Sequence, residues 1–127
     1  MRALVTGPEG ILLVRHSYMP GLHLPGGGVE PGESFEDALA KELREEASVR
    51  LTARPELFGL YLNRNSSNRD HVALYVCRAF ERGEFEPTRE IVESRFFAPE
   101  ALPEDVTGGT RRRIAEVLEG RAPDMVW

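Results

Sequence analysis

Three glutamates between residues 35 and 47 are spaced so that an α-helix would bring their carboxylates together. Glu42, Glu45 and Glu46 stand at positions i, i+3 and i+4, which are neighbours on a helix surface. At about 6 Å and an effective dielectric constant of about 20, each pair repels by about 3 kcal/mol before screening. Hard divalent cations relieve such repulsion because they bind oxygen ligands. The sequence offers no His and Cys set with zinc spacing, so the pattern indicates Mg²⁺ or Mn²⁺.

An ordinary solvated face of a Glu-rich helix is the alternative explanation, and the apolar residues of the segment argue against it. At about 100° per residue, one stripe of the helix should face the core. The residues that define this stripe are Phe35, Ala38, Leu39 and Leu43. Glu42 and Glu46 fall within the stripe and Glu45 lies at its edge, where an amphipathic helix would carry hydrophobic side chains.

The stretch before this helix contains the glycines that a close backbone approach would need. Gly26-Gly27-Gly28 predicts a turn that comes near another part of the site, although a purely structural turn is equally compatible. Ser34 is the expected N-cap of the helix over about 35–47, with Asp37 three residues on as its capping-box partner.

The elements that must position these residues alternate between strands and helices. Strands are expected at 2–6 and 11–15, joined by a turn at Pro8-Glu9-Gly10, and then at residues 22–24, 56–62, 71–80 and 93–98. A second helix is expected over about 110–119, with Ile114, Val117 and Leu118 toward the core and Arg111, Arg112 and Arg113 on its solvated face. This order predicts an α/β (α+β) fold, with a mixed sheet between helices, in one domain spanning 1–127.

Composition and charge exclude several classes of protein. Seven acidic and two basic side chains lie between Glu30 and Glu46, so this stretch alone accounts for the net charge of −5. An acidic focus on an otherwise neutral chain argues against a nucleic-acid-binding module. Because Gly7, Pro8 and Gly10 interrupt residues 1–15 before any apolar run develops, we expect this stretch to be neither a signal peptide nor a membrane span. Cys77, the one cysteine, is expected to be a small buried side chain, and the lack of disulfides favours the cytoplasm.

Residues 27–49, GGVEPGESFEDALAKELREEASV, resemble the Nudix box, G-x5-E-x7-R-E-U-x-E-E-x-G-U with U apolar. The preceding LPGG matches the usual lead-in, and a looser resemblance extends over most of the chain. Lys41 stands where the box has an arginine that orients the glutamates; it keeps the charge but loses the planar fork of donors. Ser48 replaces the glycine that ends the helix, so either Ser48 accepts an unfavourable backbone conformation or the turn differs from that of the family. His23 stands where an aromatic residue, usually Trp, is frequent.

The resemblance implies a Nudix-type α/β/α sandwich and a hydrolase that cleaves a diphosphate linkage in a nucleoside diphosphate derivative. It implies a metal site at Glu42, Glu45 and Glu46, with Glu45 and Glu46 catalytic and with the backbone carbonyl of Gly26 as a further ligand. A carboxylate from the second half of the family's chain frequently serves as base. The two candidates for that base are Glu90, which we prefer, and Glu93.

The sequence defines the chemistry of the reaction more closely than it defines the substrate. Arg15, Arg64 and Arg69 could meet phosphates and Tyr18 or Tyr61 could stack on a base, although surface or packing roles suit each of them equally well. The small chain favours a compact nucleotide such as an NTP or a nucleotide sugar, with a monomer and a homodimer both open. The competing class is a Nudix-fold module that binds a nucleotide without cutting it; the complete glutamate set favours a pyrophosphatase.

Overall fold

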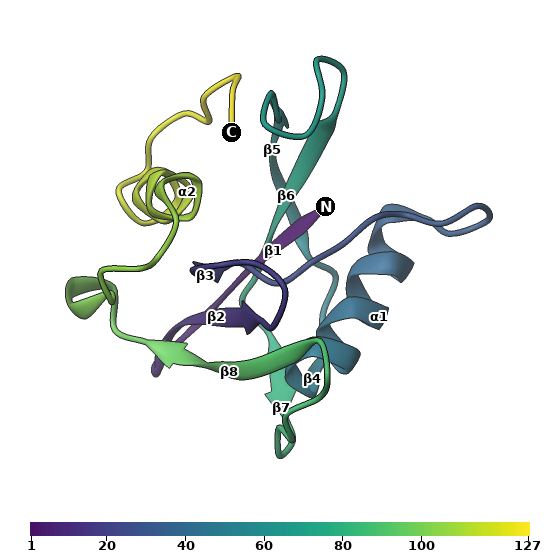
Figure 1. Ribbon diagram of the computed structural model, residues 1–127, viewed down its shortest axis with the longest axis vertical. Coiled ribbons are helices and arrows are strands. Elements are labelled where there is room, and N and C mark those ends of the chain that lie inside the picture. Colours follow the sequence, from purple (N-terminus) through teal and green to yellow (C-terminus); the bar gives the residue numbers. More distant parts are fainter.

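A mixed β-sheet lies between two helices in the computed structural model, which describes all residues from 1 to 127 (Figure 1). The strands are β1 (Arg2–Gly7), β2 (Gly10–His16), β3 (Leu22–His23), β4 (Val49–Leu51), β5 (Glu56–Leu62), β6 (His71–Cys77), β7 (Phe80–Arg82) and β8 (Ile91–Phe97). The helices are α1 (Phe35–Ala47) and α2 (Gly108–Leu118), with a 3₁₀ turn at Pro99–Ala101. The expected fold class, a mixed sheet between helices, is confirmed.

The sheet divides into two parts that separate after the first hairpin. β1 and β2 pair only at Thr6–Ile11 and Gly7–Gly10, around the turn that the sequence predicted. β1 then runs parallel to β6, which is paired with β5, while β2 pairs with β8 on one edge and with β3 at its far end. The strands therefore diverge beyond the hairpin, and each helix covers one face.

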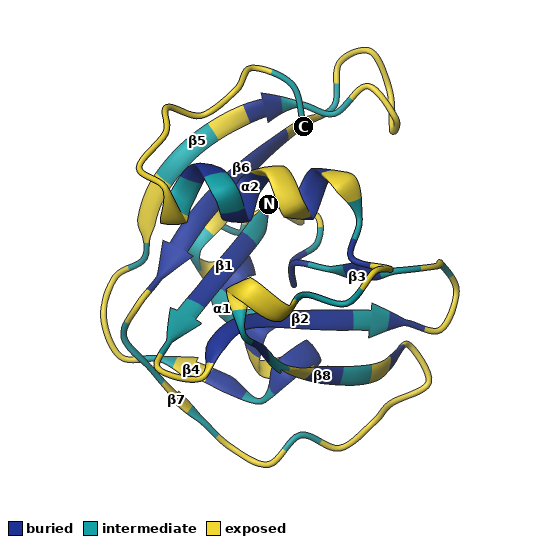
Figure 2. Cartoon of the chain, turned by 90° about the vertical axis from the view of Figure 1, so that its left-hand side faces the viewer, coloured by how far each residue is buried: buried dark blue, intermediate teal, exposed yellow.

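Two hydrophobic cores fill the space on either side of the sheet. The core beneath α1 contains Met1, Ala3, Val5, Leu12, Ala38, Leu39, Leu43, Ala47, Val49, Ala73, Tyr75 and Cys77. The core beneath α2 contains Leu4, Ile11, Leu13, Leu22, Leu24, Tyr61, Leu74, Phe97, Val106 and Ile114. Neighbouring residues of a strand point to opposite faces, so β1 and β6 supply both cores, and Figure 2 shows these strands buried behind α2. Cys77 is buried as expected, and burial raises the pKa of its thiol to about 12.

Several boundaries differ from those that the sequence predicted. The strand expected at 71–80 ends at Cys77, and Phe80–Arg82 instead pairs with Val49–Leu51 in a separate two-stranded sheet. Phe35, assigned to the core stripe, is 48% exposed because it opens α1 beyond the edge of the core. Arg113, assigned to the solvated face of α2, is completely buried. Neither α-helix is long and apolar enough to cross a membrane.

Both ends of α1 have the caps that the sequence required. The Ser34 hydroxyl accepts a hydrogen bond from the backbone N–H of Asp37 at 3.0 Å. Ser48 adopts the left-handed conformation, φ 53° and ψ 37°, and its N–H donates to the carbonyls of Arg44 and Leu43. It is the one residue other than glycine with a positive φ, so the helix ends where the Nudix pattern places glycine.

Replacing Ser48 by glycine should stabilise the protein, because a β-carbon in the left-handed region costs about 1–2 kcal/mol. Part of that gain is offset by the greater freedom of glycine in the unfolded chain. We expect Ser48→Gly to raise the melting temperature by a few degrees, a net gain of about 0.5–1 kcal/mol. Ser48→Ala keeps the β-carbon and should give no gain; a thermal melt in which both variants behave alike would contradict the assignment of strain.

Candidate active site

Glu42, Glu45 and Glu46 of α1 line one wall of a cavity of about 530 Å³. The rest of the wall comes from the glycine stretch before α1, the end of β2 and the turn before β8. These residues are His16, Tyr18, Gly26, Gly27, Thr88, Arg89, Glu90 and Ile91. The structure thus brings the three predicted glutamates together with Gly26 and Glu90.

Glu46 is the buried member of the three glutamates, only 6% exposed. Its Oε1 accepts a hydrogen bond from the backbone N–H of Gly26 at 2.9 Å, which joins α1 to the glycine stretch. Burial raises the pKa of this carboxyl to about 7, an effect that the Gly26 hydrogen bond opposes and the nearby charge of Glu42 reinforces. The carboxylate therefore has no positive partner in the protein that fully compensates its burial.

Two of the three glycines are required by close contacts. A β-carbon on Gly26, whose φ is 153°, would lie 2.1 Å from the Met1 carbonyl oxygen. A β-carbon on Gly27 would lie 2.8 Å from Oε1 of Glu42, and one on Gly28 would meet nothing within 4 Å. The glycine stretch can thus lie against β1 and against the Glu42 carboxylate at once, as the sequence predicted for Gly26 and Gly27.

The side chains of this wall have the chemistry that a hard divalent cation prefers, although they do not converge on one point. Burial and the charge of Glu45 raise the pKa of Glu42, as expected for carboxylates that lack a cation. All the side-chain donors on the helix wall are carboxylate oxygens, the ligands that Mg²⁺ and Mn²⁺ prefer. No three His, Cys, Asp or Glu side chains converge closely enough to hold a metal ion as they stand.

Lys41 bonds to the loop before α1. Its Nζ lies 2.9 Å from Glu33 and 3.7 Å from Glu30. The Glu33 carboxylate also accepts a hydrogen bond from the backbone N–H of Glu30 at 2.9 Å, and the Lys41 ammonium lowers the pKa of Glu33. Lys41 therefore fastens the loop to the helix, and its charge also acts on Glu42 by lowering the pKa of that carboxyl against the larger effect of burial.

The two candidates for the base occupy different surroundings. Glu90 lines the same cavity as the three glutamates of α1. Its turn is held by a hydrogen bond from Ser17 N to the Glu90 carbonyl, 2.8 Å, and by the Thr88 hydroxyl, which accepts from the Ile91 N–H at 3.0 Å. Glu93 lies outside the cavity lining and forms ion pairs with Arg15 and Arg95, both at 3.0 Å.

Of the residues that the sequence predicted as substrate contacts, one lines the carboxylate cavity and the others do not. Tyr18 is 68% exposed and lines the carboxylate cavity. Arg15 is held by Glu93 and, at 2.6 Å, by Asp105, so its guanidinium is already paired. Arg64 and Arg69 are exposed on the β5–β6 loop, outside the cavity linings. Tyr61 is fully buried beneath α2 and cannot stack on a ligand.

His16 is a cavity residue that the sequence reasoning missed. It is 6% exposed, and neither ring nitrogen has a hydrogen-bond partner in the protein. Its Nε2 lies 4.0 Å from Glu46, but burial and the charge of Arg2 lower its pKa to about 4, so the contact is not an ion pair at neutral pH. The alternation of β2 could have revealed it, since His16 continues the face of Leu12 and Val14.

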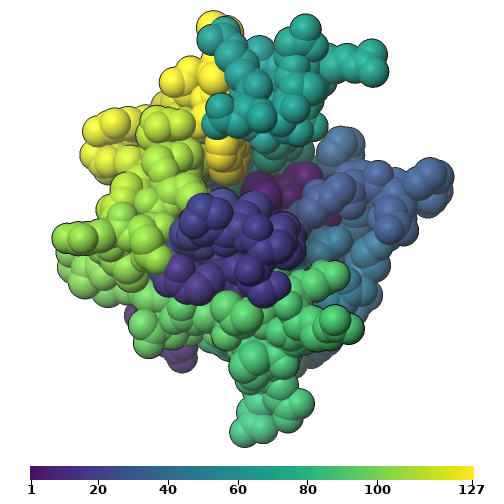
Figure 3. Space-filling model, in the orientation of Figure 1, coloured from purple at the N-terminus to yellow at the C-terminus, as the bar shows by residue number.

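A second cavity, of about 460 Å³, adjoins the first at Gly27, which lines both. Figure 3 shows the face hollowed above the first residues of the chain, between the loop before α1 and the β5–β6 loop. Its apolar lining includes Val29, Phe35, Val72 and Trp127. Its polar lining includes Arg2, His23, Asn63, Asp70 and Thr110. The first cavity thus has an acidic lining, and the second, beside it, has a mixed aromatic and polar lining.

The sequence of the chain is similar to known proteins. The profile of the NUDIX domain matches residues 1–117. A Bacillus subtilis protein whose name refers to 8-oxo-dGTP diphosphatase activity is 36% identical over 64 residues. That match covers 50% of this chain and only 42% of the relative's length.

Solved structures resemble the chain over nearly its whole length. A MutT NUDIX hydrolase from Burkholderia pseudomallei is 29% identical, with a TM-score of 0.76 over 91% of this chain and 94% of the other. An ADP-ribose pyrophosphatase from Streptococcus suis is 28% identical, with a TM-score of 0.72 over 99% of this chain and 92% of the other. A UDP-X diphosphatase is 26% identical, with a TM-score of 0.62 over 94% of this chain and 61% of the other.

The burial of Glu46 should make the stability of the metal-free protein depend on pH. Its pKa in the folded state, about 7, lies above the ordinary value of 4.5, so the folded state favours the protonated carboxyl. The stability that the neutral form gives is complete below the unfolded pKa and is lost as pH rises through 7. With a chelator present, the wild type should lose about 3 kcal/mol of unfolding free energy relative to Glu46→Gln between pH 4.5 and 8.

Chemical denaturation across this pH range measures the effect. Glu36→Gln is the matched control, since Glu36 lies on the same helix and is paired with Arg54 at 2.9 Å. That variant should keep the wild-type pH profile. Parallel profiles for wild type and Glu46→Gln would mean that Glu46 is solvated rather than buried.

Proposed function

Since this chain belongs to the Nudix hydrolase family, we propose that it is a divalent-metal-dependent pyrophosphohydrolase acting on a small nucleoside diphosphate derivative, such as an NTP or a nucleotide sugar. The observation that carries the proposal is the glutamate wall of α1, which is held against Gly26 and Gly27 and lines one cavity together with Glu90. A module that only binds nucleotides would gain nothing from a buried and uncompensated Glu46.

The names of the relatives support a diphosphate linkage as the bond that is cut. They refer to 8-oxo-dGTP, ADP-ribose and a UDP derivative. These compounds differ in base and in leaving group, but each contains a nucleoside attached to a chain of at least two phosphates. We propose the same substrate class for this chain, with the nucleoside in the second cavity and the diphosphate beside the glutamates.

Glu42, Glu45 and Glu46 would hold Mg²⁺ or Mn²⁺, with the carbonyl of Gly26 as a further ligand. Such an ion, when bound, neutralises phosphate charge and lowers the pKa of a bound water. Gly26 orients Glu46 through its N–H, and Lys41 keeps the preceding loop in place through Glu33. Glu90, which lines the same cavity, would accept the proton of the water that attacks phosphorus. Tyr18 would contact the substrate at the mouth of this cavity.

Removing one carboxylate from the helix wall tests the proposal directly. We expect Glu42→Gln, Glu45→Gln and Glu46→Gln each to lower kcat/KM by about 100-fold or more on the best substrate. Glu36→Gln should be nearly silent, because an exposed ion pair contributes little. The measurement is a product screen over NTPs and nucleotide sugars with Mg²⁺ or Mn²⁺, in which release of NMP with pyrophosphate is distinguished from release of NMP with a sugar phosphate.

Similar turnover in all four variants would exclude the metal-site assignment. Binding of nucleotides without any product, in the wild type with either metal ion, would favour the sensing module instead.

The assignment of Glu90 as base gives a separate test. Glu90→Gln should lower kcat by about 100-fold or more and leave KM nearly unchanged, since the group acts on the proton of the attacking water. Glu93→Gln serves as the matched variant: it weakens two ion pairs, with Arg15 and Arg95, but removes nothing from the cavity. Steady-state kinetics in which Glu93→Gln is the slower enzyme would reverse the assignment.

A further inference from the structure

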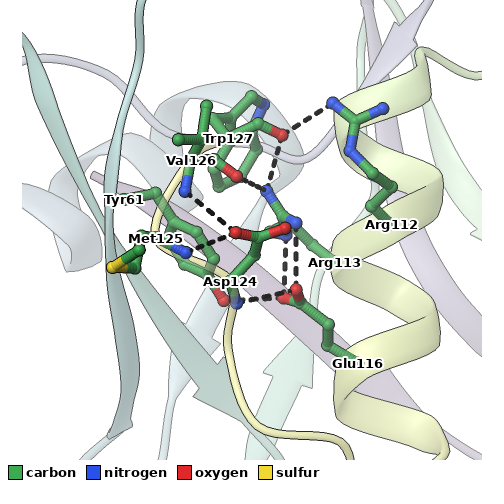
Figure 4. A network of polar contacts seen from close by, with 8 residues as sticks. All are labelled: Tyr61, Arg112, Arg113, Glu116, Asp124, Met125, Val126 and Trp127. Atoms are coloured by element: carbon green, nitrogen blue, oxygen red, sulfur yellow. Dashed lines mark hydrogen bonds and ion pairs between the residues drawn. The ribbon is translucent and has the colours of Figure 1, made fainter.

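The segment after α2, residues 119–127, is fastened to the body of the protein by a buried polar network (Figure 4). Arg113 of α2 forms a two-pronged ion pair with Glu116, at 2.8 and 3.0 Å. Glu116 also accepts hydrogen bonds from the Tyr61 hydroxyl, 2.9 Å, and from the backbone N–H of Asp124, 3.0 Å. Beyond the bonds between its two members, this pair therefore contacts β5 and the segment itself.

The remaining donors of Arg113 reach the end of the segment. Its Nη1 donates to the carbonyl oxygens of Val126 and Trp127, at 3.2 and 2.6 Å. Its guanidinium carbon lies 4.3 Å from the ring centroid of Tyr61 and 5.2 Å from that of Trp127. One completely buried side chain therefore fixes both the backbone and the indole ring of Trp127.

The body of the protein is shaped to receive this segment. A β-carbon on Gly109 would lie 2.4 Å from the indole nitrogen of Trp127, and one on Gly59 would lie 2.7 Å from Pro123. The backbone of Leu62, at the end of β5, also exchanges hydrogen bonds with the segment, at 2.7 and 2.9 Å. Two glycines and a strand end thus hold the indole in one position.

That position is the wall of the second cavity. Trp127 lines it together with Phe35, while Asn63, Asp70 and Thr110 supply polar groups to the same space. The rings of Tyr61 and Trp127 pack edge to face, with their centroids 5.4 Å apart and an angle of 90° between their planes. The indole is therefore also supported from the sheet. Aromatic surface beside a few hydrogen-bonding side chains is the combination that recognises a nucleobase.

We propose that Trp127 is the residue on which the substrate's base stacks, and that Arg113 is the positioning residue that holds the indole in place. The proposal rests on the proposed function, because it places the base of that substrate in the second cavity. Arg113 touches no substrate. It acts by fixing a side chain that would otherwise lose rotamer freedom on binding, so the stacking surface is in place before the ligand arrives.

Trp127 is the only tryptophan of the chain, so its fluorescence reports on this wall alone. The intact protein would be titrated, with EDTA present to prevent turnover, with GMP, AMP and UMP and, as probes without a base, with ribose 5-phosphate and inorganic pyrophosphate. We expect at least one of the mononucleotides to quench the fluorescence saturably. The two probes without a base should leave it unchanged.

Steady-state kinetics on the best substrate provide the second readout. Trp127→Ala should raise KM by about tenfold or more, as expected for the loss of one base-stacking contact, with kcat within a few-fold of wild type. Trp127→Phe should recover most of the loss. Arg113→Lys keeps a charge beside Glu116 but loses the planar guanidinium that contacts Trp127. Like Trp127→Ala, it should therefore weaken binding, which here appears as weaker quenching of the Trp127 fluorescence by the mononucleotides.

Arg112→Gln is the matched control for Arg113. Arg112 is exposed and donates to the same backbone oxygen of Trp127, at 2.7 Å, without contacting the ring. It should leave both quenching and KM unchanged. If Arg113→Lys does not fold, the wild-type titration and Trp127→Ala still decide the question. An unquenched wild type, or an unchanged KM in Trp127→Ala, overturns the inference.

Failure of this inference and failure of the proposed function look different. Hydrolysis that is lost in Glu46→Gln but unaffected by Trp127→Ala would remove only the role of Trp127. Base-dependent quenching in a protein that hydrolyses none of the nucleotides would retain that role and remove the enzymatic function.

Discussion

The hydrogen bond from the backbone N–H of Gly26 to the buried carboxylate of Glu46 determines how the rest of the site is arranged. It draws the last turn of α1 against the glycine stretch, and it does so at a position of the helix that packing alone would fill with a hydrophobic side chain. The contact is possible only because Gly26 and Gly27 carry no β-carbons, which would collide with β1 and with Glu42. Burial of Glu46 costs stability, and the two capped ends of α1 and the core of Leu39 and Leu43 beneath it offset that cost.

The divergence of the sheet explains why the two cavities adjoin. β1 and β2 separate after two residue pairs, so the end of β2 carries His16 toward α1 while β1 continues beside β6. The glycine stretch crosses between them and bridges to Arg2, which places Gly27 in the lining of both cavities. A cavity lined by carboxylates and a neighbouring cavity with an aromatic and polar lining therefore follow from one feature of the sheet.

Several charged side chains are already paired with one another, whereas the glutamates that line the acidic cavity are not. Arg15, Glu93 and Asp105 satisfy one another, and Lys41 is occupied by the loop acids. Arg113 and Glu116 form a buried pair, which is weak evidence for stability but fixes geometry well, because each lost partner would leave a buried charge alone. Glu42, Glu45 and Glu46 differ from these pairs because no arginine or lysine side chain bonds to them directly.

The sequence by itself determined the helix, its caps, the glutamate spacing and the family, because these depend on local periodicity and on a contiguous motif. It placed Glu42, Glu45, Glu46 and Gly26 in one site, and it identified Ser48 as the strained helix end. Only the tertiary structure decided between Glu90 and Glu93 as a cavity residue, paired Arg15 with acids 78 and 90 residues away, and buried Arg113 and Tyr61. It also brought Trp127 to the cavity, from a segment without periodicity or motif. These outcomes depend on contacts between distant parts of the chain, for which the spacing of neighbouring residues carries no signal.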